Sequence, residues 1–293
     1  MRQPKGGQFL QQAVFLGPSL VVFSIILIAP FLLGIYYSFT DWNGLTDHPN
    51  WVGWSNWIRV LTDDPYFGQA FLFTIKYSVV NVLLINVGGL LLALLLTGKL
   101  KGTSLYRTAF FVPNVIGGLL LGFIFQFIFV KGFSSLGELT GMWPFNLPWL
   151  GTPATAFWAI ISIGVWQSAG YMMMIYIAGI LSIPSELVEA ATIDGAGRFR
   201  TFRSITLPLL MPAITICMFL TISHSFKAYD QILSLTGGGP FRSTVVVTMD
   251  IYDEAFGRNN MGYGSAKAVI FFLIIAVITL AQVWTTKRKE VEA

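Results

Sequence analysis

The sequence has little cysteine, little histidine and little charge. Its 293 residues include one cysteine, Cys217, and two histidines, His48 and His224, and charged residues make up 11% of the chain. A single cysteine excludes an internal disulfide and any metal site built from several cysteines. An enzyme site needs a nucleophile, a base or a metal set in one place, and the two histidines are far apart in the sequence. We therefore expect no catalytic residues and no metal-binding residues.

The chain also lacks a nucleotide-binding motif. The triple glycine of LTGGGP, residues 235–240, is followed by Phe241 and Arg242. A phosphate-binding loop instead ends in Gly-Lys-Ser/Thr and opens a helix. We interpret the stretch as a turn and expect no cofactor on this chain, so that any hydrolysis of ATP, with its Mg²⁺, belongs to another chain.

Apolar residues are what the sequence has in excess. Hydrophobic residues make up 55% of the chain, aromatic residues 15%, and the mean hydropathy is +0.69. These values are typical of membrane proteins, in which a spanning helix needs about 20 mostly apolar residues. Six stretches qualify, which predicts an all-α membrane protein with six transmembrane helices: 13–39, 71–96, 110–129, 156–181, 209–226 and 268–285.

The basic residues indicate how the spans are oriented. Both ends of the chain and the segments 99–107 and 198–203 together hold eleven of the 18 Lys and Arg residues. All four lie on one side of a six-span protein, which predicts that both termini are cytoplasmic. The first span is long and no small-residue cleavage site follows it, so we expect a retained anchor. Topology accounts for the pI near 9.2 without nucleic acid. No internal repeat or linker is visible, so we expect one membrane domain over residues 1–293.

The six predicted spans contain no Asp or Glu. Proton-coupled carriers usually depend on intramembrane acids, so this absence weighs against a channel or secondary carrier that works without ATP. Lys76 and Lys267 lie near span ends, where we expect their amines to reach the outer interface. His224 in the fifth span is more typical of a hydrogen-bonded packing residue than of a proton relay.

A polar loop interrupts the chain between the fourth and fifth spans, at residues 182–208. Pro184, Ser185 and Glu186 are favourable at a helix start, and Gly195 and Gly197 break the helix about ten residues later. A rigid cytoplasmic protrusion is one interpretation of this pattern. A plain re-entry loop with basic residues is the other, and these features alone do not separate the two.

This loop resembles the EAA signature of permease subunits in binding-protein-dependent ABC importers. The match comprises Glu189-Ala190-Ala191, Gly195, Ile205 and Leu207-Pro208, with the spacings of the signature. Further segments are similar to carbohydrate-uptake permeases, more to the F-type than to the G-type subunit of maltose permeases: TDWNG at 40–44, WVGWSNW at 51–57, YRTAFFVPNVIGG at 106–118, LTGGGP at 235–240 and MGYGSA at 261–266.

The resemblance implies a type I ABC importer permease in a bacterial or archaeal cell membrane. Its expected partners are a second homologous permease, two cytoplasmic ATPases, an extracytoplasmic sugar-binding protein, a sugar and the membrane lipid. The loop would then be the coupling helix that docks on an ATPase. The residues expected to couple are Glu189, Ala190, Ala191, Asp194, Gly195 and Arg198.

A polar helix face in the fourth span predicts where the sugar passes. Residues spaced i, i+3, i+4 and i+7 share one side of a helix, and polar groups within a bilayer must face protein or a water-filled cavity. The candidates are Gly164, Gln167, Ser168 and Tyr171, with Asn114, Thr221, His224 and Ser225. The alternative is that these groups only hydrogen-bond neighbouring helices. They carry little positive charge, which favours a neutral oligosaccharide over a phosphate ester such as glycerol phosphate.

Overall fold

The structure, a computed structural model, describes residues 5–98 and 100–290. Every regular element within these residues is a helix, and the only extended pairing is an isolated bridge between Thr40 and Trp51. The chain forms two compact units: Met1–Pro65 with Ile251–Phe272, called unit 1 here, and Tyr66–Asp250 with Leu273–Ala293, called unit 2. The expectation of a single membrane domain stays a prediction.

Unit 1 contains the first candidate span and the loop that follows it. The span covers Val14–Tyr37, and none of its most apolar window is buried within the chain. Side chains that face lipid gain nothing from being covered by their own chain, so this exposure agrees with a membrane helix. The elements are α1 (Lys5–Phe23), η1 (Ser24–Ile28), α2 (Ala29–Tyr37), α3 (Ser55–Thr62), η6 (Asp253–Gly257) and the start of α15 (Met261–Lys287).

A buried group of charges in unit 1 corrects one expectation. Lys267 is 1% exposed, and its Nζ lies 2.8 Å from Asp64 Oδ2 and 3.3 Å from Glu254 Oε2. Tyr263 donates a hydrogen bond of 2.8 Å to Asp64, and Arg258 contacts Glu254 at 3.3 Å. The prediction that Lys267 reaches the interface is therefore wrong. It failed because both carboxylates precede the spans that the sequence predicts.

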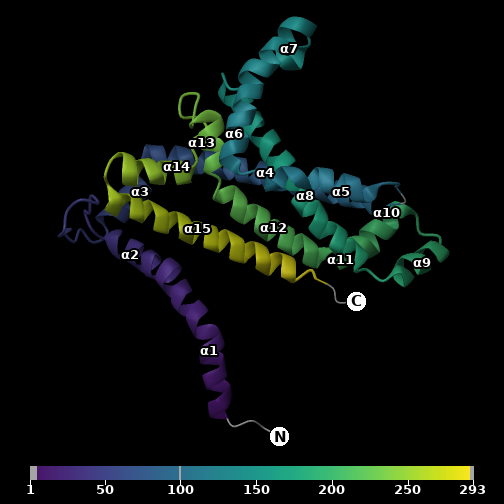
Figure 1. Cartoon of the computed structure of the whole chain (residues 1–293), viewed down its shortest axis with the longest axis horizontal. Helices are drawn as coiled ribbons and strands as arrows, with labels where there is room; N and C mark the ends of the chain where they lie inside the picture. The colour runs from purple at the N-terminus through teal and green to yellow at the C-terminus, as the bar shows by residue number, and fades with distance from the viewer. Residues whose placement is uncertain (1–4, 99, 291–293) are drawn as a thin grey trace. The chain divides into compact units, whose positions relative to one another are not determined.

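Unit 2 holds most of the spanning helices, which Figure 1 shows in order along the colour bar. Its elements before the polar loop are α4 (Pro65–Leu96), α5 (Thr103–Phe111), η2 (Val112–Val115), α6 (Gly118–Phe127), η3 (Ile128–Gly132), α7 (Phe133–Thr140), η4 (Trp143–Phe145) and α8 (Pro153–Leu181). The polar loop and the segments after it form α9 (Ser185–Ile193), α10 (Arg198–Thr201), η5 (Phe202–Thr206), α11 (Leu207–Leu209), α12 (Met211–Phe226), α13 (Asp230–Thr236) and α14 (Val247–Tyr252).

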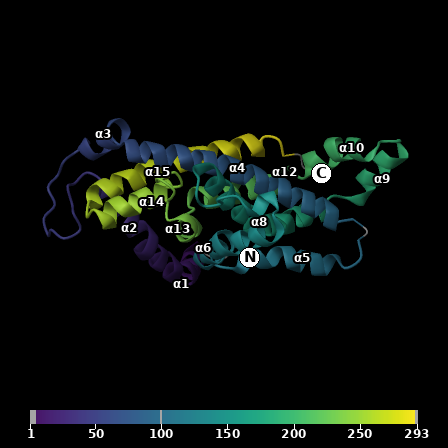
Figure 2. The same cartoon turned by 90° about the horizontal axis from the view of Figure 1, so that it is seen from above.

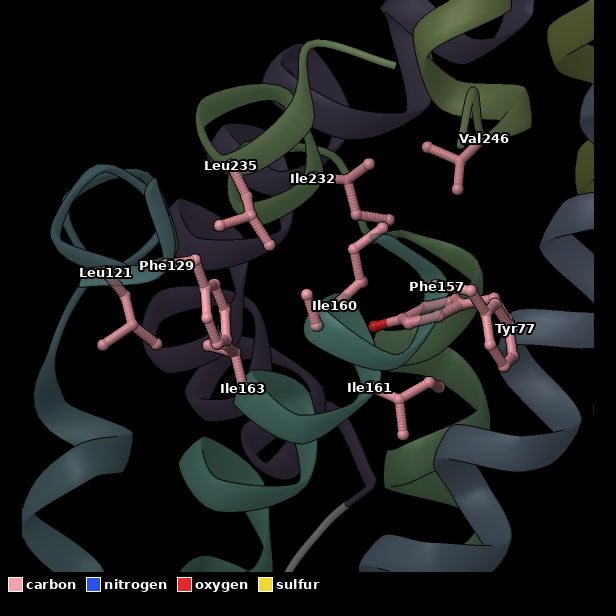
Figure 3. Packing of buried hydrophobic residues seen from close by; sticks show 11 residues of the cluster. Tyr77, Leu121, Phe129, Phe157, Ile160, Ile161, Ile163, Ile232, Leu235 and Val246 are labelled. Carbon is pink, nitrogen blue, oxygen red and sulfur yellow. The ribbon is translucent and has the colours of Figure 1, made fainter. Parts of the chain in front are cut away.

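α8 is the central helix of unit 2. Its residues Ala159, Ile160 and Ile163 are fully buried against α4, α6 and α13. Figure 3 shows Ile160 pointing toward Ile232 of α13 and Phe157 lying beside Tyr77 of α4. This packing immobilises the face of α8 that the sequence predicts to be polar.

The helix boundaries differ from the predicted spans at several ends. The third candidate span runs over 118–140 instead of 110–129, because the helix breaks at Ile116 and Gly117, and it includes Glu138. The fifth is bent by 68° between Arg198–Leu209 and Met211–Phe226, so the structure has five candidate spans, or six if the bent pair counts as one. α15 starts at Met261, seven residues earlier than predicted, because its first turns contain Ser265 and Lys267 and are less apolar than the sequence criterion requires.

Candidate functional site

Two helix breaks in unit 2 lie beside spanning segments, one just before the third candidate span and one just after α12. Between η2 and α6 the backbone is extended at Ile116, with φ −78° and ψ 126°. Between α12 and α13 it leaves the helical region at Tyr229, with φ −141° and ψ −65°. Irregular backbone at membrane depth is tolerated only where it is buried in protein or lines a water-filled cavity, because its polar groups need partners. The two breaks therefore point to a cavity.

A cavity of 330 Å³ lies at these breaks, with walls from α4, η2, α6, α8, α12 and α13. All eight residues predicted for the sugar pathway line it, which unites segments from three separate parts of the sequence. They are Asn114, Gly164, Gln167, Ser168, Tyr171, Thr221, His224 and Ser225. The volume lies in the usual range of small-ligand sites, about 300–1,000 Å³.

Three of the eight residues are bonded to protein groups, as the alternative interpretation requires. Gln167 Nε2 donates to the carbonyl of Ile116 at 2.8 Å and so holds the break before α6. Ser225 accepts from Asn81 at 3.1 Å, and Thr221 accepts from Asn86 at 2.9 Å. These groups join helices as well as facing the cavity.

The other polar side chains of the predicted set are free for a ligand. Among the described residues, none hydrogen-bonds the side chains of Asn114, Ser168, Tyr171 or His224. They offer an amide, two hydroxyls and an imidazole, which can both donate and accept hydrogen bonds. Tyr171 adds an aromatic ring, whose centroid lies 6.4 Å from that of Phe111. The arrangement suits a polar ligand with one apolar face.

Several lining residues escaped the sequence analysis. α4 contributes Tyr77 and Asn81, and the segment after α12 contributes Lys227, Asp230 and Gln231. The signal for Asn81 was an amide in the middle of an apolar span. The signal for Lys227, Asp230 and Gln231 was a charged segment directly after the fifth span.

Gly164 serves the cavity through its lack of a side chain. A Cβ at this position would lie 2.8 Å from Asn81 Oδ1. The glycine thus lets α4 approach α8, and Asn81, which is 4% exposed, reaches across to α12. Asn81 Oδ1 itself is buried without a hydrogen-bond partner among the described residues.

The polar loop is a second candidate site. α9 ends in a left-handed turn in which Gly195 has φ +75°. The amide of Gly195 donates to the carbonyl of Thr192 at 3.1 Å, and the amide of Ala196 donates to that of Ala191 at 2.9 Å. These two bonds form a Schellman motif, which ends a helix in a defined direction. The protrusion is therefore a rigid helix and turn.

The surface of this loop is open. Glu189, Ala190, Asp194, Gly195 and Arg198 are exposed, and only Ala191 of the predicted coupling set is buried. The apolar side chains of Ile193 and Phe199 are 86% and 76% exposed within the chain. Figures 1 and 2 show α9 and α10 at one end of unit 2, with α13 toward the other end. The loop and the cavity are thus separate sites of one unit.

The sequence was compared with protein-family models. Residues 85–291 match the model described as "Binding-protein-dependent transport system inner membrane component". The chain belongs to this family. The match includes the spans that line the cavity and the polar loop, and it confirms the prediction of a membrane transport subunit that is not an enzyme.

Relatives with curated names are similar over nearly their whole length. The chain is 47% identical over 280 residues, covering 95% of this chain and 94% of the relative, to the "Probable starch degradation products transport system permease protein AmyD" of Thermoanaerobacterium thermosulfurigenes. It is 36% identical to the "Multiple sugar-binding transport system permease protein MsmF" of Streptococcus mutans, covering 94% and 95%. The resemblance to ABC sugar permeases is thereby confirmed.

A solved structure supports the fold. A chain of a bacterial ABC transporter "involved in the import of the acidic polysaccharide alginate" superposes with a TM-score of 0.83 at 22% identity, covering 97% of this chain and 96% of that one. The helical ABC importer permease fold is thus observed, while the cytoplasmic location of both termini remains a prediction.

Proposed function

We propose that this permease carries a neutral oligosaccharide through the cavity of unit 2 and that ATP hydrolysis on partner chains drives the import. One observation carries the proposal: two interrupted helices border a cavity in which Asn114, Ser168, Tyr171 and His224 have no hydrogen-bond partner among the described residues. A sugar presents hydroxyls that use such groups and a ring face that packs on an aromatic side chain. The relatives named for starch degradation products and multiple sugars support the substrate class.

The cavity chemistry separates this proposal from import of a phosphate ester. A phosphate is usually bound by several cations or by a fork of arginine donors. Among the residues that the structure describes, the cavity lining has one lysine and no arginine, and Asp230 lies in the same wall. A neutral sugar fits this balance of charge better than glycerol phosphate. Membership of the transport family also makes an ATP-independent channel or carrier the weaker alternative.

The partners follow from the family. A structural neighbour, an alginate transporter, is described "in complex with alginate pentasaccharide-bound periplasmic protein". We infer that this chain likewise receives its sugar from an extracytoplasmic binding protein and pairs with a second permease in a bacterial or archaeal cell membrane. The exposed α9 turn, with Glu189, Gly195 and Arg198, would dock on one of two cytoplasmic ATPases, which supply the ATP and Mg²⁺ chemistry.

Uptake by the complete transporter in liposomes tests the proposal. The chain, its partner permease and its ATPases are reconstituted and supplied with the sugar-loaded binding protein and internal ATP. We expect accumulation of starch-derived glucose oligosaccharides that depends on ATP. Tyr171→Phe or Ser168→Ala should raise the KM for sugar roughly fivefold to tenfold, because loss of one neutral hydrogen bond costs about 1–1.5 kcal/mol.

Met174→Ala is the matched control, since Met174 lies on the same helix, is 39% exposed and does not line the cavity. It should leave uptake unchanged. Co-purification of the ATPases with each variant shows that assembly is intact. Uptake without ATP, uptake by the isolated chain, or unchanged kinetics for every substitution on this face of α8 would each contradict the proposal.

A further inference from the structure

The segment that joins α12 to α13 brings two opposite charges to the cavity. Lys227 is the C-terminal cap of α12, and Asp230 is the first residue of α13. Both line the cavity and both are exposed. They are three residues apart, a spacing at which opposite charges on one continuous helix can pair. Here the non-helical backbone at Tyr229 separates them.

Neither charge is neutralised by the chain. Among the described residues, none forms an ion pair or a side-chain hydrogen bond with Lys227 or Asp230. Both charges lie just after the candidate span that ends at Phe226. Charged groups at such positions usually face water or a partner.

The neighbouring amides are unsatisfied as well. Gln231 Nε2 and Asn81 Oδ1 are buried, have no hydrogen-bond partner among the described residues, and belong to side chains that line the same cavity. Asn81 is 4% exposed as a whole residue. A buried polar group without a partner lowers stability, so a ligand that completes these bonds gains affinity.

We propose that Lys227 and Asp230 together select sugars with adjacent neutral hydroxyls and reject sugars that carry a carboxylate. The inference rests on the proposed function. The Asp230 carboxylate has two oxygens that can accept from two neighbouring hydroxyls, and the Lys227 ammonium can donate to a hydroxyl or ring oxygen. The carboxylate of a uronate is attracted by the Lys227 ammonium and repelled by the Asp230 carboxylate, so the two effects oppose each other. The hydroxyls of a neutral diol can form hydrogen bonds with both groups.

The lining geometry supports close contact at this wall. A Cβ at Gly118 would lie 3.6 Å from the Cβ of Asp230 and 3.7 Å from that of Gln231. The absence of a side chain at Gly118 thus keeps the approach to Asp230 open. A larger residue there would occupy the space in which a sugar ring meets the carboxylate.

The test measures equilibrium binding and uptake by the complete transporter in nanodiscs and liposomes. The probes are a starch-derived glucose oligosaccharide, the same oligosaccharide with one terminal glucuronate, and one with a single deoxy position. The variants are Asp230→Asn and Lys227→Gln. Matched controls are Glu138→Gln and Lys131→Gln, which remove the same charges from exposed positions outside the cavity lining.

Asp230→Asn should weaken binding of the neutral oligosaccharide about 10- to 100-fold, which is the loss expected for hydrogen bonds to a charged group. It should also reduce the ratio of the affinity for the neutral oligosaccharide to the affinity for the glucuronate probe by about tenfold or more. The deoxy probe should lose less affinity in this variant than in the unmodified protein. Lys227→Gln should weaken both probes and penalise glucuronate more. A purely structural role would lower assembly or kcat without changing the ratio between probes.

The inference would be overturned if both variants kept the unmodified ratio of affinities for the neutral and glucuronate probes. If the unmodified transporter still imported the neutral oligosaccharide, the proposed function would stand. A Gly118→Leu variant gives a second test, because it should block binding while the binding-protein-stimulated ATPase activity persists; normal binding there also contradicts the inference. Failure of the unmodified transporter to import any neutral sugar would instead refute the proposed function.

Discussion

Removing the buried lysine of unit 1 should destabilise the protein more than any charge removal at its surface. In Lys267→Met the carboxylates of Asp64 and Glu254 lose the ammonium that lies 2.8 and 3.3 Å away. Both side chains are at most 8% exposed, so water cannot replace it. Breaking a buried ion pair by removing one partner costs about 3–5 kcal/mol.

The expected shift in thermal stability follows from this value. One kcal/mol lowers the Tm of a chain of this order of size by roughly 2–4 °C, so Lys267→Met should lower it by about 10 °C. Tryptophan fluorescence during heating of the detergent-solubilised complex measures the change. Lys131→Met, at an exposed lysine, is the control and should stay close to the unmodified protein.

A compensating variant makes the reasoning refutable. Lys267→Met combined with Asp64→Asn and Glu254→Gln removes all three charges, and replacement of a buried ion cluster by neutral groups is often close to neutral in stability. The triple variant should therefore recover most of the lost Tm. If the single variant is as stable as the control, or if the triple variant is less stable than the single one, the cluster does not act as described.

Three further outcomes are expected. Gly195→Val should abolish uptake and binding-protein-stimulated ATP hydrolysis while the chain still inserts, because φ +75° is costly for a β-branched residue; normal transport would contradict this. Gly170→Val should cost about 1–3 kcal/mol by overpacking against α5, measured as a lower Tm than that of Gly68→Ala, where the added methyl meets nothing. Hydrogen bonds from Asn50 lower the pKa of the Asp41 carboxyl from its usual 3.8. Protection of the Asn50 amide in hydrogen exchange should therefore be complete above pH 3.8 and decline as the pH falls through the lower pKa of the folded state. Protection that does not change with pH would show that the bond is absent.

The sequence predicted the polar face of α8 correctly because a single helix determines it. Gly164, Gln167, Ser168 and Tyr171 share one side through the helical period alone, and all four line the cavity. The left-handed conformation at Gly195 was equally predictable, since a glycine after a run of helix formers is typical of a helix end.

Other contacts could not be predicted because they join distant segments. Asn81 gave a local signal as an amide in an apolar span, but its bond to Ser225 spans 144 positions. The interruption of the third span was hidden by an apolar composition that continues across Ile116 and Gly117. The length of an apolar stretch indicates how many residues can cross a membrane, but it does not indicate where the helix bends.

The sequence by itself determined that the chain lies in a membrane as helices, because a backbone in hydrocarbon must satisfy its own hydrogen bonds and only long apolar helices do so here. It also predicted the helix start and the glycine break of the polar loop, whose hydrogen bonds are local. Only the tertiary structure decided which polar groups meet. Tyr263 and Asp64, 199 positions apart, share one hydrogen bond, and two helix breaks far apart in the sequence border one cavity. Such pairings depend on packing in three dimensions, where the partner of a buried charge is set by which helix ends come together.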